Sequence, residues 1–430
     1  MLLASLLAAL LLMQQPVPQA DTTAIAPADS AMVSDRDLDE TIADVDGARP
    51  KPEIRPIIAP SAFYSPVRGF GIGGGVSVWN AARAGDRLHV EGRLTQRYQS
   101  LWGSYSTSNP AQSRVYGLIG AGATTTSRHP YYGTSPRYNR DAKLDIDRAA
   151  LEVEGRVGWA PFGPRTVVFQ PTLQFRYDRL RDYAEADGSS IELATPADLR
   201  QLDALRDDPR HGVSGGLSVL LDTRDDEVMP RSGVVLQSAL TQFVATDTTN
   251  LRFTRGQATV TMFHPALFRI PFLPEPGAFF VRANVVVTRQ GGEDPLPYMY
   301  LPDLDRDLLV GFPRRRFQGR DAASLAVGVR GVVAQVIGAF LVEGMAFGMV
   351  GAAYDDISAD FTPRVTFDPG SVDPAGRVPL RPSAAVGMNV HFIDRERPLL
   401  GVVLGGGPEG LTSATFRIVY PLRWYRPEIR

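Results

Sequence analysis

Residues 166–178 read TVVFQPTLQFRYD and alternate between apolar and polar side chains. One face would hold Val167, Phe169, Leu173, Phe175 and Tyr177, and the other Gln170, Thr172, Gln174 and Arg176. This period of two predicts a β-strand with different surroundings on its two sides. The segment is longer than the usual strand of about 5–6 residues, whereas a tilted strand that crosses a bilayer needs about 9–11. The pattern therefore favours a membrane-spanning strand over a strand of a soluble sandwich.

The same alternation recurs on both sides of this segment. Strands are predicted at 55–64, 69–79, 86–98, 101–107, 113–125, 144–158, 166–178, 212–222, 232–243, 250–263, 279–290, 322–331, 338–348, 383–393, 399–405 and 412–422. Bacterial single-chain barrels have an even number of strands and a polar interior, and several polar faces here carry Arg and Glu. The predicted fold class is therefore all-β, a 16-stranded antiparallel transmembrane β-barrel.

The lengths of the connections support this count. The long ones are 126–143, 179–211, 291–321 and 349–382, and each follows an odd-numbered strand. Outer-membrane barrels have long extracellular loops and short periplasmic turns. We therefore expect these four connections outside the cell, and no long helical period after the N-terminal leader.

Four regions are predicted along the chain. Residues 1–20 carry a short apolar run and are expected to be a signal peptide, because the run is too short for a transmembrane helix. Residues 21–54 are acidic and poor in large apolar side chains, which is typical of a disordered periplasmic leader. Residues 55–424 form the barrel, and 425–430 a C-terminal tail.

Composition excludes several kinds of chemistry. The chain has no Cys, and its net charge of −2 gives no field that would attract nucleic acid. The five histidines show no spacing typical of metal ligands: His89, His129, His211, His264 and His391. His391 and Ser383 share a face, but it is the polar one, and no Gly-x-Ser-x-Gly elbow is present. We therefore expect neither a cofactor, nor a metal, nor an enzymatic activity.

Several motifs resemble the bacterial surface-antigen superfamily, which contains the outer-membrane assembly factor BamA, its relative TamA and the two-partner secretion transporters. They are Phe63-Tyr64-Ser65-Pro66 with Gly69-Phe70-Gly71, Tyr131-Tyr132-Gly133, Leu221-Asp222-Thr223-Arg224-Asp225, Leu309-Val310-Gly311-Phe312 with Arg316-Phe317, and Val342-Glu343-Gly344. The resemblance covers about residues 55–424. It implies an outer-membrane barrel of the BamA/TamA type that inserts or translocates polypeptide.

The resemblance also implies two sites. In the family the long loop folds into the lumen, and an Arg at its tip pairs with the acidic residue of a later strand. Val310 replaces that Arg here, so we expect Glu343 to pair with a nearby arginine, best with Arg316. The predicted lumenal loop lock comprises Gly311, Phe312, Arg314, Arg315, Arg316 and Glu343. The predicted periplasmic turn motif comprises Asp222, Thr223, Arg224, Asp225, Pro230 and Gly233, which either cap the turn or contact a client.

Three functions remain open from the sequence. The first is insertion or translocation of polypeptide through a weak seam between the first and last strands. The second is a passive or gated pore with loop 291–321 as its plug, and the third is a structural surface barrel. The expected location is the outer membrane of a Gram-negative-type bacterium. The expected partners are outer-membrane lipid, client polypeptides and a separate periplasmic protein, because the leader is too short for the family's periplasmic POTRA repeats.

Overall fold

The computed structural model divides into residues 1–51 and 52–430, and the described residues all belong to the second unit. They are 54–65, 69–82, 86–107, 114–133, 143–162, 167–186, 195–226, 229–266, 277–302, 304, 309–312, 315–337, 340–368, 370–392 and 398–418. The predicted signal peptide, nearly all of the predicted leader and the predicted tail lie outside these ranges.

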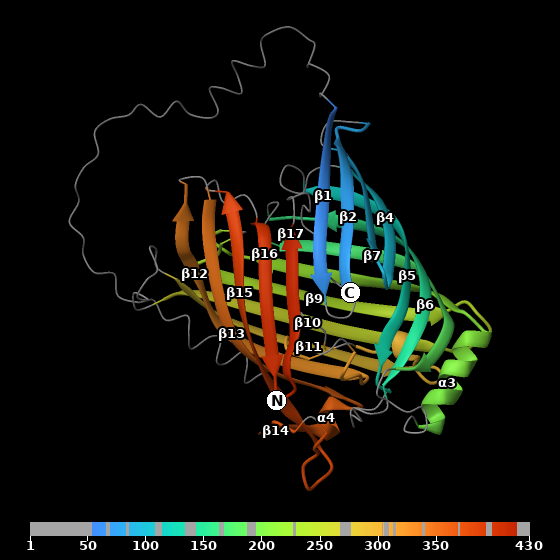
Figure 1. The fold of residues 1–430 in the computed structure, drawn as a ribbon. Coiled ribbons are helices and arrows are strands. Elements are labelled where there is room, and N and C mark those ends of the chain that lie inside the picture. Colours follow the sequence, from blue (N-terminus) through green and yellow to red (C-terminus); the bar gives the residue numbers. More distant parts are fainter. Residues whose placement is uncertain are drawn as a thin grey trace, which may run out of the picture. The chain divides into compact units, whose positions relative to one another are not determined.

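Strands make up almost all of this unit (Figure 1). They are β1 Arg55–Ser65, β2 Gly69–Trp79, β3 Arg87–Thr95, β4 Tyr98–Thr107, β5 Val115–Tyr131, β6 Leu144–Trp159, β7 Val167–Glu185, β8 Arg210–Asp222, β9 Gly233–Ala245, β10 Arg252–Pro265, β11 Ala278–Gln290, β12 Asp321–Val336, β13 Phe340–Tyr354, β14 Phe361–Val365, β15 Val378–Phe392, β16 Pro398–Gly407 and β17 Gly410–Ile418. The helices are α3 Pro196–Asp207, α4 Ile357–Asp360 and the 3-10 turn η3 Tyr298–Tyr300.

Sixteen of these strands form one antiparallel sheet, and each pairs with its neighbours in the chain. The exception is the short β14, which pairs parallel to β15, while β13 pairs directly with β15. β1 and β2 pair along their whole length, from Arg55–Trp79 to Ser65–Gly69. By contrast, the pairing of β1 with β17 comprises Phe63–Arg417 and Tyr64–Phe416 among the described residues. The sixteen predicted strands are thus confirmed.

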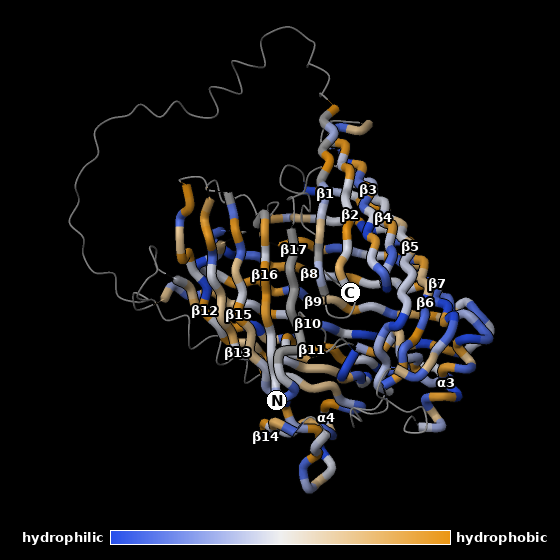
Figure 2. The backbone as a smooth tube through the Cα atoms, in the orientation of Figure 1, coloured by the Kyte–Doolittle hydropathy of each residue, from blue (hydrophilic) through white to orange (hydrophobic). Residues whose placement is uncertain are grey.

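The two faces of the sheet have inverted polarity. On β7 the apolar Leu173 is 61% exposed, whereas Gln170 and Asp178 are buried. On β15 Val386 is exposed and His391 is buried. Figure 2 shows the resulting alternation of hydrophilic and hydrophobic positions along the strands. We call the face with buried polar side chains the inner face and the apolar, exposed one the outer face.

Several details differ from the prediction. The connection expected at 349–382 contains β14 and α4, and β13 continues to Tyr354 while β15 begins at Val378. β5 and β7 continue to Tyr131 and Glu185, into segments expected to be loop, and both strands contain a bulge on the way. The connection after β7 also contains α3, although no helix was expected there. Thr195 caps α3 by accepting a hydrogen bond from the backbone N–H of Asp198 at 3.1 Å. Among the described residues, no helix is long and apolar enough to cross a membrane.

Candidate functional site: the inner loop

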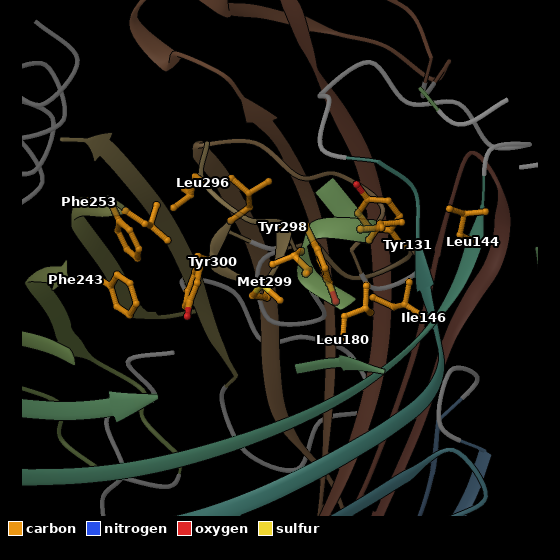
Figure 3. Packing of buried hydrophobic residues seen from close by; sticks show 14 residues of the cluster. Tyr131, Leu144, Ile146, Leu180, Phe243, Phe253, Leu296, Tyr298, Met299 and Tyr300 are labelled. Carbon is orange, nitrogen blue, oxygen red and sulfur yellow. The ribbon is translucent and has the colours of Figure 1, made fainter. Parts of the chain in front are cut away.

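We call the connection between β11 and β12, residues 291–320, the inner loop, and its described residues pack against the inner face of the sheet. Its first half contributes Leu296, Tyr298, Met299, Tyr300 and Leu301 to a buried cluster (Figure 3). The other members come from α3 and from the ends of β5, β6, β7, β9 and β10: Tyr131, Leu144, Ile146, Leu180, Leu202, Leu205, Phe243, Leu251 and Phe253. Large apolar area buried in this way holds the first half in place.

The second half of the inner loop packs on other strands of the inner face. Leu309, Val310, Phe312 and Phe317 form a second cluster with inner-face residues of β11, β12, β13 and β15. Gly311 at the tip has φ +100°, a conformation that favours glycine. A Cβ atom there would lie 2.5 Å from the carbonyl oxygen of Gly406 and 3.1 Å from Cβ of Ser383. The tip therefore lies directly against β15 and β16, which requires glycine.

The basic side chains that follow the tip contact aromatic rings and a carboxylate. The guanidinium of Arg316 lies 4.7 Å from the ring centroid of Tyr132 and pairs with the carboxylate of Glu409, in the turn between β16 and β17. Arg315 lies 5.4 Å from the ring centroid of Tyr298. Cation–π contacts of this kind strengthen when they are buried. Arg316 thus connects the loop to Tyr132, directly after β5, and to the β16–β17 turn.

Glu343 does not pair with Arg316, so the predicted lock is wrong in its partner. Glu343 is 1% exposed and accepts hydrogen bonds from Arg330 Nε at 2.5 Å and Asn389 Nδ2 at 3.0 Å. His391 Nε2 lies 3.3 Å from Oε2, the oxygen that also accepts from Asn389, whereas Arg330 donates to Oε1. Neighbouring strands β12 and β15 supply all three partners. A buried carboxylate is stable only with such compensation.

The distance between Glu343 and the loop tip along the strands explains why Glu343 does not pair with Arg316. The loop tip lies at the level of Ser383, which pairs with Met349 on β13. Glu343 is six residues further along β13, or about 20 Å at the rise of a strand, towards the end with short turns. Arg316 remains at the end with long loops, beside Glu409. Gly311, Phe312, Arg315 and Arg316 are thus brought together, Glu343 belongs to a separate network, and Arg314 lies outside the described residues.

The end of the inner loop is anchored at Asp321, which the sequence did not single out. Asp321 is fully buried and accepts hydrogen bonds from the backbone N–H groups of Thr288 at 2.9 Å and Ile357 at 3.0 Å. Arg289 Nη1 donates to both of its oxygens at 3.0 Å. One carboxylate therefore joins β11, β12 and the segment that carries α4.

The predicted turn motif forms a self-capped connection between β8 and β9. Arg224 Nε donates to Asp222 Oδ1 at 2.9 Å, and the Thr223 hydroxyl accepts from the backbone N–H of Val234 at 3.0 Å. Gly233 has φ +107°, and a Cβ there would lie 2.5 Å from the Thr223 carbonyl oxygen. Pro230, three residues before Gly233 in the same turn, is buried.

Asp225 closes this turn with three hydrogen bonds. Its Oδ1 accepts from the backbone N–H groups of Asp226 at 3.0 Å, Arg231 at 2.9 Å and Ser232 at 3.1 Å. Partial burial raises the pKa of Asp225, but these backbone donors outweigh that effect and leave the pKa below its ordinary value. The motif therefore satisfies its own polar groups, in agreement with the turn-capping interpretation.

Two partners of Glu343 could have been found in the sequence. Period two places Arg330 on the same face of the predicted strand 322–331 as the polar Ser324. It likewise places Asn389 on the same face of the predicted strand 383–393 as His391. Nothing local marks Glu409, because its contact with Arg316 depends on how the inner loop folds. Among the described residues, no group of three or more His, Asp or Glu side chains is arranged to hold a metal ion.

No family model matches the chain, and neither does any curated protein. Solved structures do resemble it. The crystal structure of BamA from Haemophilus ducreyi lacking POTRA domains 1–3 matches with a TM-score of 0.58 and 11% identity, over 85% of this chain and 70% of that one. The fold is similar to that of BamA. CdiB from Escherichia coli matches with a TM-score of 0.53 and 12% identity, over 84% of this chain and 62% of CdiB. The chain thus spans less than two thirds of CdiB, and identities this low show the fold alone.

Proposed function

We propose that the chain is a 16-stranded transmembrane β-barrel of the bacterial outer membrane. The observation that carries this proposal is the inverted polarity of the two faces. Large apolar side chains such as Leu94, Leu173 and Val386 are exposed, while polar ones such as Glu154, Gln170 and Glu343 are buried. In water such an outer face would be costly, whereas a bilayer solvates it and a hydrated lumen accommodates the inner face.

We further propose that the barrel inserts or translocates polypeptide through the seam between β1 and β17. These strands pair at Phe63–Arg417 and Tyr64–Phe416, whereas β1 and β2 pair along eleven residue positions. Among the described residues this ladder is short, and the backbone donors and acceptors at such a seam could pair with an incoming strand, as in β-augmentation. The similarity of the fold to BamA and CdiB supports the same kind of activity.

Disulfide closure of the seam tests this function, and the chain has no native cysteine to interfere. Tyr64→Cys with Phe416→Cys, at paired positions, would join β1 to β17. Val76→Cys with Val90→Cys joins β2 to β3 at paired positions and serves as the control. We expect oxidation of the seam pair to stop insertion of a client barrel into proteoliposomes and oxidation of the control pair to leave it intact. Full insertion with a closed seam would contradict the proposal.

A gated pore is the second candidate, because the inner loop packs on two walls of the inner face. Single-channel recording separates the two functions. A pore would conduct steadily and show no client insertion, whereas a plugged translocator would show only brief openings. A non-enzymatic role, without cofactor, stays a prediction under both functions.

A further inference from the structure

Two neighbouring polar residues on the inner face of β11 carry buried donors without a partner among the described residues. Arg282 is paired in register with Thr261 on β10 and Ala326 on β12, and Asn284 with Thr259 and Ser324. Arg282 and Asn284 are two residues apart on one strand face, or about 7 Å. Asn284 is 8% exposed, and its Oδ1 accepts a hydrogen bond from the Thr259 hydroxyl at 2.7 Å.

Both side chains hold buried donors without an acceptor. Asn284 Nδ2 and Arg282 Nε have no hydrogen-bond partner among the described residues. Arg156, in contrast, pairs with Glu154, and Arg330 pairs with Glu343. A buried donor left without an acceptor costs free energy, and more so when it is charged. The two donors are therefore suited to bind an acceptor atom of a ligand.

No described residue of the inner loop supplies that acceptor. Four residues after Asn284 on β11, the hydroxyl of Thr288 lies 3.2 Å from Nε of Arg255 on β10. Arg255 also donates a hydrogen bond to the backbone carbonyl of Tyr300 in the loop. Val286, the next inner-face residue after Asn284, packs against Leu304 and other apolar loop residues. Arg282 and Asn284 thus lie next to these loop contacts on the inner face, towards the end of the sheet with short turns.

We propose that Arg282 and Asn284 form a binding site for an oxyanion, either a phosphate or a carboxylate. A guanidinium and an amide N–H₂ present donors only, and charge-assisted hydrogen bonds to an oxyanion are among the strongest available to these groups. The hydroxyl groups of Thr261 and Ser324, at the paired positions, add further donors on the same face. The ligand is either a small phosphate-containing solute or an acidic side chain of a polypeptide in the lumen. The site needs a hydrated lumen but not the insertion activity.

Calorimetric titration of inorganic phosphate into the purified full-length protein, in phosphate-free detergent solution, tests the site. We expect binding to one site, weakened at least tenfold by Arg282→Gln, since one charge-assisted hydrogen bond amounts to about that factor. Asn284→Asp should weaken it similarly, because the new carboxylate occupies Arg282 and repels the anion. Arg156→Gln removes a paired inner-face arginine and should leave binding unchanged.

A peptide of alternating Asp and Gly distinguishes the two sources of the oxyanion. Competition between the peptide and phosphate, lost in Arg282→Gln, would assign the site to polypeptide carboxylates. Binding of phosphate without competition would assign it to small phosphate solutes. The proposal is overturned if wild type binds neither probe, or if Arg282→Gln binds them as wild type does. Heat-modifiable migration on unboiled gels shows that each variant is folded, and no client is needed, so the outcome is independent of the insertion assay.

Discussion

At the scale of single residues, two charge networks on the inner face are built from local partners. Glu343 contacts Arg330, Asn389 and His391, and Arg316 contacts Glu409 and Tyr132. Each network lies at a different height, so one can be changed without the other. This separation gives a sharp expectation for double variants.

We predict that Glu343→Gln and Arg330→Gln each lower the free energy of unfolding by about 1–3 kcal/mol, because each leaves a buried partner without compensation. The double variant should show a coupling energy of about 0.5–3 kcal/mol, whereas Glu343→Gln with Arg316→Gln should be additive within about 0.5 kcal/mol. Denaturant titrations in lipid measure both. Strong coupling between Glu343 and Arg316 would show that the loop reaches further than the structure places it.

The turn residue Asp225 gives a pH-dependent prediction. Its pKa is lowered in the folded protein by backbone N–H donors, although partial burial opposes this. A lowered pKa stabilises the fold above the unfolded value of about 3.9, and this stabilisation is lost as the pH falls through the folded pKa. Wild type should therefore be more stable than Asp225→Asn at pH 7, and the difference should shrink steadily as the pH falls below about 4. A difference that stays constant over this pH range would assign the effect to something other than the charge.

At the scale of elements, the strands were predictable because apolar and polar side chains alternate along each strand, and this alternation follows directly from the different surroundings of its two faces. All sixteen were located, and errors fell where tertiary contacts decide the outcome. β5 and β7 continue past the apolar pattern because their ends pack against the inner loop and α3. The helix itself had a local signal that was not used, since Thr195, Pro196 and Asp198 form an N-terminal cap before Leu199, Leu202 and Leu205.

The two faces of β7 allow a matched test of the membrane assignment. Leu173→Arg places a charge on the outer face and should cost about 2–4 kcal/mol near the middle of the bilayer. Gln174→Arg, one residue along on the inner face beside Arg176, should cost much less. Folding yield in lipid vesicles, read from heat-modifiable migration, compares the two. Equal yields would count against a lipid-facing outer face.

At the scale of the whole molecule, the sixteen strands and their order in the sheet could be predicted, and the site only in part. Motifs placed Gly311, Phe312 and Arg316 in one loop, and the structure brings them together at its tip. The partner of Arg316 could not be predicted, because Glu409 is distant in sequence and meets it only once the loop has folded inward. The long connections lie at one end of the sheet and the short ones at the other, which sets how the chain would span a membrane.

Cysteine labelling on intact cells tests most directly the claim that the sheet is a membrane-spanning barrel. Gly370→Cys lies in the long connection after β13, and Phe162→Cys in the short connection after β6, where Phe162 is 75% exposed. With a membrane-impermeant maleimide, we predict that Gly370→Cys is labelled on intact cells and Phe162→Cys only after the outer membrane is permeabilised. Labelling of both positions, or of neither, on intact cells would contradict a barrel that crosses the membrane with its long loops outside.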